Sequence, residues 1–197
     1  MRDFALRMAP LVTALPAPTS AIAGSVVRLA ADNKPYWCDG TAWLALTAPI
    51  SDARLTTVRL TADVTNATTT LANVTGLTVA LNASSTYVID AWVMFQTAAT
   101  TTGIRLTQSV PSGATVVANW ATPLTATTAT LAHQRAGDVG AASASIDTAN
   151  FNTLATGRLL VITGVTAGSL QIRFASEVAA SNAVVKAGSS LTAIKTN

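Results

Sequence analysis

The stretch Thr86–Thr97 restricts the possible folds of this chain more than any other segment, because apolar residues occupy both of its alternating sets of positions. Successive side chains of a β-strand point to opposite faces of the sheet. One face would carry Tyr87, Ile89, Ala91, Val93 and Phe95. The other face would carry Val88, Asp90, Trp92, Met94 and Gln96. Since both faces are largely apolar, we predict a central strand, covered by a second sheet on one face and by another subunit on the other.

The chain around this strand also has the pattern of strands separated by turns. Further strands are expected at 57–61, 68–81 (interrupted at Gly76), 103–107, 114–120, 157–165, 169–176 and 183–195. About eight strands at this spacing predict an all-β fold, an antiparallel, jelly-roll-like β-sandwich over residues 56–197. The segment 122–150 is rich in Ala, Ser and Thr, and we expect it to form long surface loops.

Three short segments precede the predicted sandwich. Residues 1–23 contain Pro10, Pro16 and Pro18, which favours an extended attachment arm or a disordered tail. Residues 24–47 predict a small β-hairpin module, and residues 48–55 predict a linker.

The small module is unusually aromatic. Asp39-Gly40 lies between two apolar runs and predicts a tight type I′ hairpin, which needs positive φ at both central residues. Tyr36, Trp37 and Trp43 lie on its two arms, and so short a module cannot bury three large rings by itself. We therefore predict that these rings pack against another surface. The full set of predicted interface residues is Tyr36, Trp37, Trp43, Trp92 and Phe95.

Composition restricts the class of protein. Only 11% of the residues are charged, against about a quarter in typical soluble domains, which favours an oligomer that hides much of its surface. The net charge is +3 and the basic residues are scattered, so we expect no nucleic-acid partner. No apolar run approaches the roughly 18 residues of a spanning helix, so we expect no membrane insertion.

Residues suited to catalysis are sparse. The single histidine, His133, is expected to face solvent in a loop, and the single cysteine, Cys38, to be a small packed residue. No acid pair, nucleophile elbow or phosphate-binding loop is recognisable. Trp92 and Trp120 could serve as sugar platforms, but core packing explains Trp92 better. We therefore expect no enzymatic activity, no cofactor and no metal.

Two segments resemble proteins of tailed bacteriophages. Residues 24–46, with the Asp-Gly-Thr-x-Trp pattern of Asp39 to Trp43, resemble a short module near the start of phage fibre and appendage proteins. Residues 63–77 and 87–102, together with 168–177 and 184–191, are similar to a β-sandwich of phage virion proteins. In those proteins, trimers of jelly rolls form head fibres, tail fibres and collar spikes.

The resemblance implies a role in the virion. It predicts a homotrimeric structural protein, made in the host cytoplasm, that forms a short fibre, spike or decoration protein. Its N-terminal arm would attach to a capsid or tail protein. The alternative is the tip domain of a tail fibre that binds a host receptor or glycan through loops at 97–102 and 122–150. A third hypothesis is a polysaccharide depolymerase.

Overall fold

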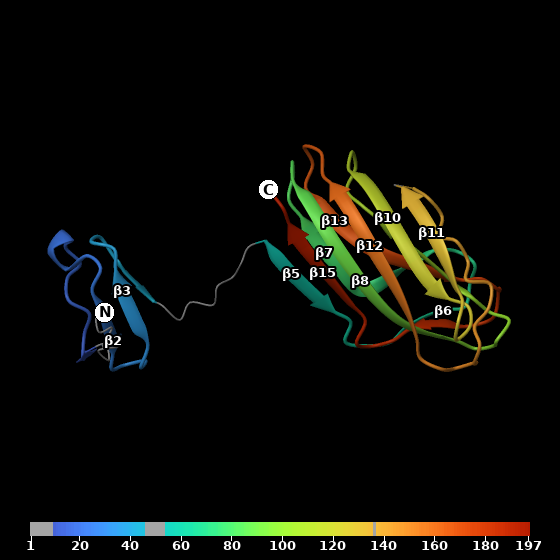
Figure 1. The fold of residues 1–197 in the computed structure, drawn as a ribbon, viewed down its shortest axis with the longest axis horizontal. Helices are drawn as coiled ribbons and strands as arrows, with labels where there is room; N and C mark the ends of the chain where they lie inside the picture. The colour runs from blue at the N-terminus through green and yellow to red at the C-terminus, as the bar shows by residue number, and fades with distance from the viewer. Residues whose placement is uncertain (1–9, 46–53, 136) are drawn as a thin grey trace, which may run out of the picture. The chain divides into compact units, whose positions relative to one another are not determined.

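The computed structural model describes residues 10–45, 54–135 and 137–197. They belong to two compact units that divide between Asp52 and Ala53, within the predicted linker 48–55 (Figure 1). Much of the predicted arm 1–23 is described, from Pro10 onward, and this part belongs to the same unit as the hairpin module.

The small unit is a four-stranded sheet in the order β1-β2-β3-β4. Its strands are β1 (Leu11–Val12), β2 (Val26–Leu29), β3 (Pro35–Cys38) and β4 (Trp43–Ala45), with a short 3-10 helix, η1 (Ser20–Ile22), between the first two. The predicted arm supplies β1, which pairs parallel to β2. The backbone N–H groups of Arg28 and Ala30 donate to the carbonyls of Pro10 and Val12. Part of the arm therefore forms a strand on its own module, and this pairing needs no partner protein.

The hairpin turn differs from the predicted type I′ turn. Asp39 to Ala42 form a four-residue connection, closed by a 3.1 Å hydrogen bond from Asp39 N–H to the Ala42 carbonyl. Gly40 has a positive φ of 97°, but Asp39 does not have one. The Asp39 carboxylate instead accepts from the backbone N–H groups of Thr41 and Ala42, each at 2.7 Å. These bonds favour a wider loop over the two-residue turn.

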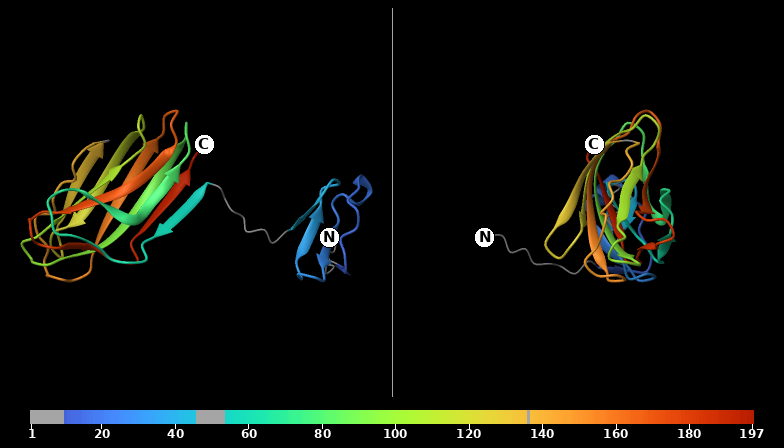
Figure 2. Two further views of the ribbon diagram at one scale, coloured as in Figure 1. Left: turned by 180° about the vertical axis from the view of Figure 1, so that it is seen from behind. Right: turned by 90° about the vertical axis from the view of Figure 1, so that its right-hand side faces the viewer.

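The large unit is an antiparallel β-sandwich, which confirms the predicted fold class (Figures 1 and 2). Its larger sheet has eight strands, β5 (Leu55–Arg59), β6 (Val64–Asn66), β8 (Thr86–Thr97), β10 (Thr115–Pro123), β11 (Ala129–Arg135), β12 (Thr153–Ile162), β14 (Ala183–Val185) and β15 (Ser190–Lys195). Its smaller sheet has three, β7 (Ala72–Leu81), β9 (Ile104–Ser109) and β13 (Gly168–Ser176). In the larger sheet, β8 lies between β12 on one side and β14 and β15 on the other.

The core lies between the two sheets. All five odd-numbered residues from Tyr87 to Phe95 are buried, as predicted for one face of this strand. The smaller sheet contributes Leu170, Ile172 and Phe174 from β13, also buried, as its alternating pattern predicts. Burial of such side chains stabilises a fold by about 1.5–3 kcal/mol each.

Two features of the strands bear on the predictions. The expected interruption at Gly76 is present, with a φ of 99° and a register shift between β7 and β13. The Gln171 amide there donates to the Val74 and Leu77 carbonyls, which lack regular ladder partners. The prediction of loops throughout 122–150 is wrong in part, because β11 lies inside this segment and pairs with β10 over its whole length.

Candidate functional site

One face of the small unit is covered by its own chain. Tyr36 and Trp43 lie on this face with Cys38, which is fully buried. The Trp43 indole N–H donates to the Pro16 carbonyl at 2.7 Å. Residues of the predicted arm thus contact one of the rings that the sequence suggested would need a partner. Both Tyr36 and Trp43 are half-buried.

Trp37 lies on the opposite face of the small sheet. The strand register places it between Val26 of β2 and Leu44 of β4, and all three side chains are exposed. We call these three residues the small-unit stripe. Together with Leu11 of β1, which is also exposed, it leaves apolar surface of this unit available to another protein.

Hydrogen bonds set the ionisation of two acids in the small unit. The pKa of Asp39 is lowered because the N–H groups of Thr41 and Ala42 donate to its carboxylate, with a further bond from the Thr41 hydroxyl. The Tyr36 hydroxyl donates to Asp32 at 2.7 Å, which lowers the pKa of Asp32 and raises that of Tyr36. Both acids therefore fix local turns in their ionised form.

The larger sheet of the sandwich has a second face, turned away from the core, which we call the outer face. One line of facing residues crosses it in strict register on five neighbouring strands. These residues, the apolar row, are all exposed: Val117, Leu160, Val88, Ile194 and Leu55. A row of this kind is unusual on a sheet face that meets water.

A parallel line of polar residues, the polar row, lies two positions along each strand. It consists of His133, Asn119, Arg158, Asp90 and Thr192. At its centre the Arg158 guanidinium lies 3.8 Å from the Asp90 carboxylate. His133 hydrogen-bonds Asn119 through Nδ1, so the histidine is exposed as predicted but belongs to strand β11, not to a loop.

The positions of Trp92, Trp120 and Phe95 correct three predictions about aromatic residues. Trp92 is 53% exposed on the outer face, so core packing does not explain it. Trp120 is the buried tryptophan, and its indole N–H donates to the Gln108 side chain at 2.8 Å. Phe95 was predicted at an interface, but it points into the core and is fully buried. Phe95 is therefore not available to a partner.

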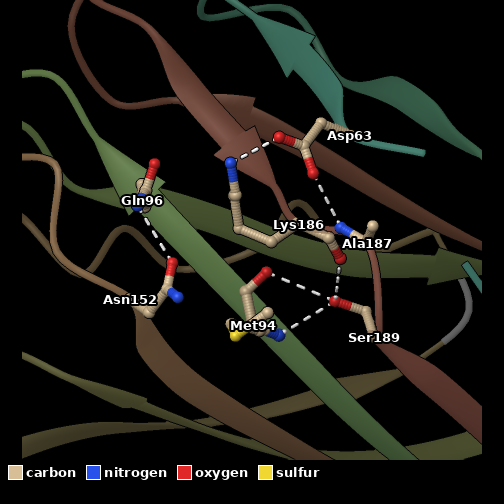
Figure 3. A network of polar contacts seen from close by, with 7 residues as sticks. All are labelled: Asp63, Met94, Gln96, Asn152, Lys186, Ala187 and Ser189. Atoms are coloured by element: carbon tan, nitrogen blue, oxygen red, sulfur yellow. Dashed lines mark hydrogen bonds and ion pairs between the residues drawn. The ribbon is translucent and has the colours of Figure 1, made fainter. Parts of the chain in front are cut away.

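A network of polar contacts joins the β14–β15 turn to β8 (Figure 3). The Lys186 ammonium contacts Asp63, and the Ala187 N–H donates to the same carboxylate at 2.8 Å, which together lower the pKa of Asp63. The Ser189 hydroxyl accepts from the Met94 N–H at 3.0 Å. These bonds hold the β14–β15 turn in place against β8.

Three further observations concern metal ions, the thiol and membrane-spanning helices. Within these ranges, no three His, Cys, Asp or Glu side chains gather closely enough to hold a metal ion. Cys38 is a free, buried thiol. In the part of the chain that the structure describes, no helix is long and apolar enough to cross a membrane.

Comparison with known proteins identifies no family. No family model and no curated protein matches the chain. Among solved structures, T=1 particles derived from infectious bursal virus give a TM-score of 0.24 at 10% identity, over 77% of this chain and 41% of the other. The VP2 subviral particle of infectious bursal disease virus gives 0.23 at 12% identity, over 77% and 43%. The chain thus spans less than half the length of these proteins, and similarity this remote carries no argument about function.

Proposed function

We propose that the protein is a non-enzymatic structural protein of a bacteriophage virion, which assembles with copies of itself into a short fibre, spike or decoration. The observation that carries this proposal is the apolar row, five exposed aliphatic side chains in register across the outer face. Ile162, two positions along β12 from Leu160, is exposed as well, and large apolar patches on a protein surface often mark an interaction site. The assignment to a phage rests on the sequence resemblance.

The small unit is the proposed attachment point. The resemblance places attachment to a capsid or tail protein in the arm, but the arm's described part contacts its own module through β1 and the Trp43–Pro16 bond. We therefore assign attachment to the unit as a whole, through the small-unit stripe. A partner that covers Val26, Trp37 and Leu44 would bury the apolar surface that the arm leaves open.

The molar mass of the full-length protein tests the assembly. Size-exclusion chromatography with light scattering at micromolar concentration should give a stable oligomer, and the resemblance predicts three copies. A stable monomer would contradict the proposal. Attachment is tested separately with Trp37→Ala, which should lower incorporation into particles without changing the oligomer. Ala31→Ser, in the exposed turn between β2 and β3, serves as its control.

A further inference from the structure

We propose that the outer face packs against the outer face of a second copy of this chain, across a two-fold axis that runs parallel to β8 and β12 and between them. The inference rests on the proposed function, which requires copies to assemble. It adds the surface used and the symmetry of the contact.

The order of the strands makes the outer face divisible into two matching halves. At the level of the apolar row, β12, β10 and β11 lie on one side of the axis, and β8, β15 and β5 lie on the other. The rotation would therefore place β12 over β8, β10 over β15 and β11 over β5 of the second copy. The rotation leaves the position of each row along the strand direction unchanged. The apolar row of one copy would therefore pack against the apolar row of the other.

The charges on this face are complementary under the rotation. Arg158 of each copy would lie over Asp90 of the other, because the two residues face each other across the axis. Their side chains are 88% and 49% exposed, and the 3.8 Å separation within one chain is longer than a hydrogen bond. The guanidinium therefore has donors left for a second carboxylate. Two crossed pairs would form at the centre of the contact.

Two further arginines on this face meet no like charge. Arg135 would lie over Leu55 of the second copy, because β11 and β5 exchange places. Arg59 would lie over Leu131 for the same reason. The aliphatic stems of arginine pack well on such side chains while their charged ends reach solvent.

Trp92 has a complementary position in the second copy. The rotation places it over Thr156, its facing residue on β12. Thr156 lines a hollow of the outer face, whose walls are Thr156, Gly157 and Arg158 of β12 and Asp90, Ala91 and Trp92 of β8. A tryptophan ring has roughly 150–250 Å² of surface to bury, and here it would also approach the Arg158 guanidinium. Trp92 borders this hollow in its own chain, so the two-fold contact would place the ring of each copy beside the hollow of the other.

The size of the face fits a stable contact. Across the sheet, six strands at the usual spacing span about 29 Å. Along the strands, the eight residue steps from Leu154 to Ile162 span about 27 Å, so the face covers roughly 800 Å². A standard interface buries about this area on each partner. Two sheets stacked in this way pack with their strands nearly aligned.

Two charge variants of the full chain test the contact. Asp90→Arg alone and Arg158→Asp alone each place like charges opposite one another in a pair of identical copies. We expect either change to raise the dissociation constant at least tenfold. When the two variants are mixed, every crossed pair is attractive again, and association should return to near the wild-type level. Circular dichroism of each variant checks that these exposed positions leave the fold unchanged.

A matched pair of apolar substitutions supplies the control. Val117→Asp introduces a charge into the apolar row and should weaken association, whereas Val165→Asp, at a site 92% exposed in the turn after β12, should not. The contact is supported if the wild-type protein is a dimer, the charge variants and Val117→Asp weaken it, and Val165→Asp does not. Wild-type trimers, or dimers insensitive to the charge variants, overturn the two-fold contact but leave the proposed function standing. A wild-type monomer overturns both.

Discussion

Gly157 on β12 is a position where one added methyl group should disturb the packing of the sandwich against a single buried ring. An ideal Cβ there would lie 2.8 Å from Cζ3 and 2.9 Å from Cε3 and Cη2 of Trp120, closer than real Cβ atoms come. The ring is 1% exposed and its N–H is bonded to Gln108, so it has little room to move. Gly157→Ala should thus cost about 1–3 kcal/mol for overpacking and about 1 kcal/mol for the weakened buried bond.

Part of this cost is offset, because alanine in a strand is favoured over glycine by about 0.5–1 kcal/mol. The net loss in free energy of unfolding is about 1–3 kcal/mol, or roughly 4–12 °C in Tm for a unit of this size. Thermal and urea unfolding followed by tryptophan fluorescence measure both quantities. Val165→Ala, in the exposed turn after β12, is the control and should change stability by less than about 0.5 kcal/mol.

A double-mutant cycle decides whether the indole is the cause. In a Trp120→Leu background the added methyl has space, so Gly157→Ala should there be neutral or stabilising. If Gly157→Ala costs as much in that background as in the wild type, or costs nothing in either, the close approach of Trp120 to β12 is not what limits this position.

The remaining predictions concern the polar contacts. Trp43→Phe removes the indole donor to the Pro16 carbonyl and should lower the stability of the small unit by about 1 kcal/mol, measured as increased hydrogen exchange in β1; an unchanged exchange rate would contradict this. The lowered pKa of Asp63 means that its contact with Lys186 stabilises the fold above the ordinary aspartate pKa and is lost as pH falls through the lowered value. At neutral pH wild type should therefore be more stable than Asp63→Asn, and this difference in free energy of unfolding should shrink as the pH falls through the lowered pKa. A difference that stays constant with pH would count against the contact. Asp39→Ala should disorder the hairpin loop, seen as a changed Trp43 fluorescence, whereas Asp39→Asn should largely preserve it because an amide oxygen can accept the same bonds.

Sequence patterns predicted the parts of the sandwich that depend on local alternation. The buried odd-numbered face of β8 and the buried Leu170, Ile172 and Phe174 of β13 follow from period two. Strand β11 was missed because its residues, Ala129 to Arg135, have little intrinsic strand preference. It is held by pairing along β10, so its neighbours determine its conformation.

The roles of Trp92 and Trp120 could not be separated by their local sequence. Both lie in strands, and burial of Trp120 depends on the facing Gly157, which lies in a distant part of the sequence. A glycine in a strand often marks close approach of another group, and Gly157, the first residue of the predicted strand 157–165, was the available signal. Using it required the register between β10 and β12, which only the structure supplies. The same holds for the arm, whose pairing with β2 is parallel and follows from no turn motif.

The even-numbered face of β8 carries the one clue in the sequence to what the outer face does. It differs from the core face in having Asp90, and a lone carboxylate is too costly to bury in a core. Polarity alone therefore identifies it as the outer face, yet Val88 and Trp92 on either side of Asp90 do not suit permanent contact with water. Arg158 resolves this conflict, because it gives the carboxylate a neighbouring cation and makes the centre of the face neutral overall. Removing an ion pair from water costs much less free energy than removing a single charge, because each group gains a crossed partner in the second copy. For this reason we expect the outer face to pack against the outer face of another copy.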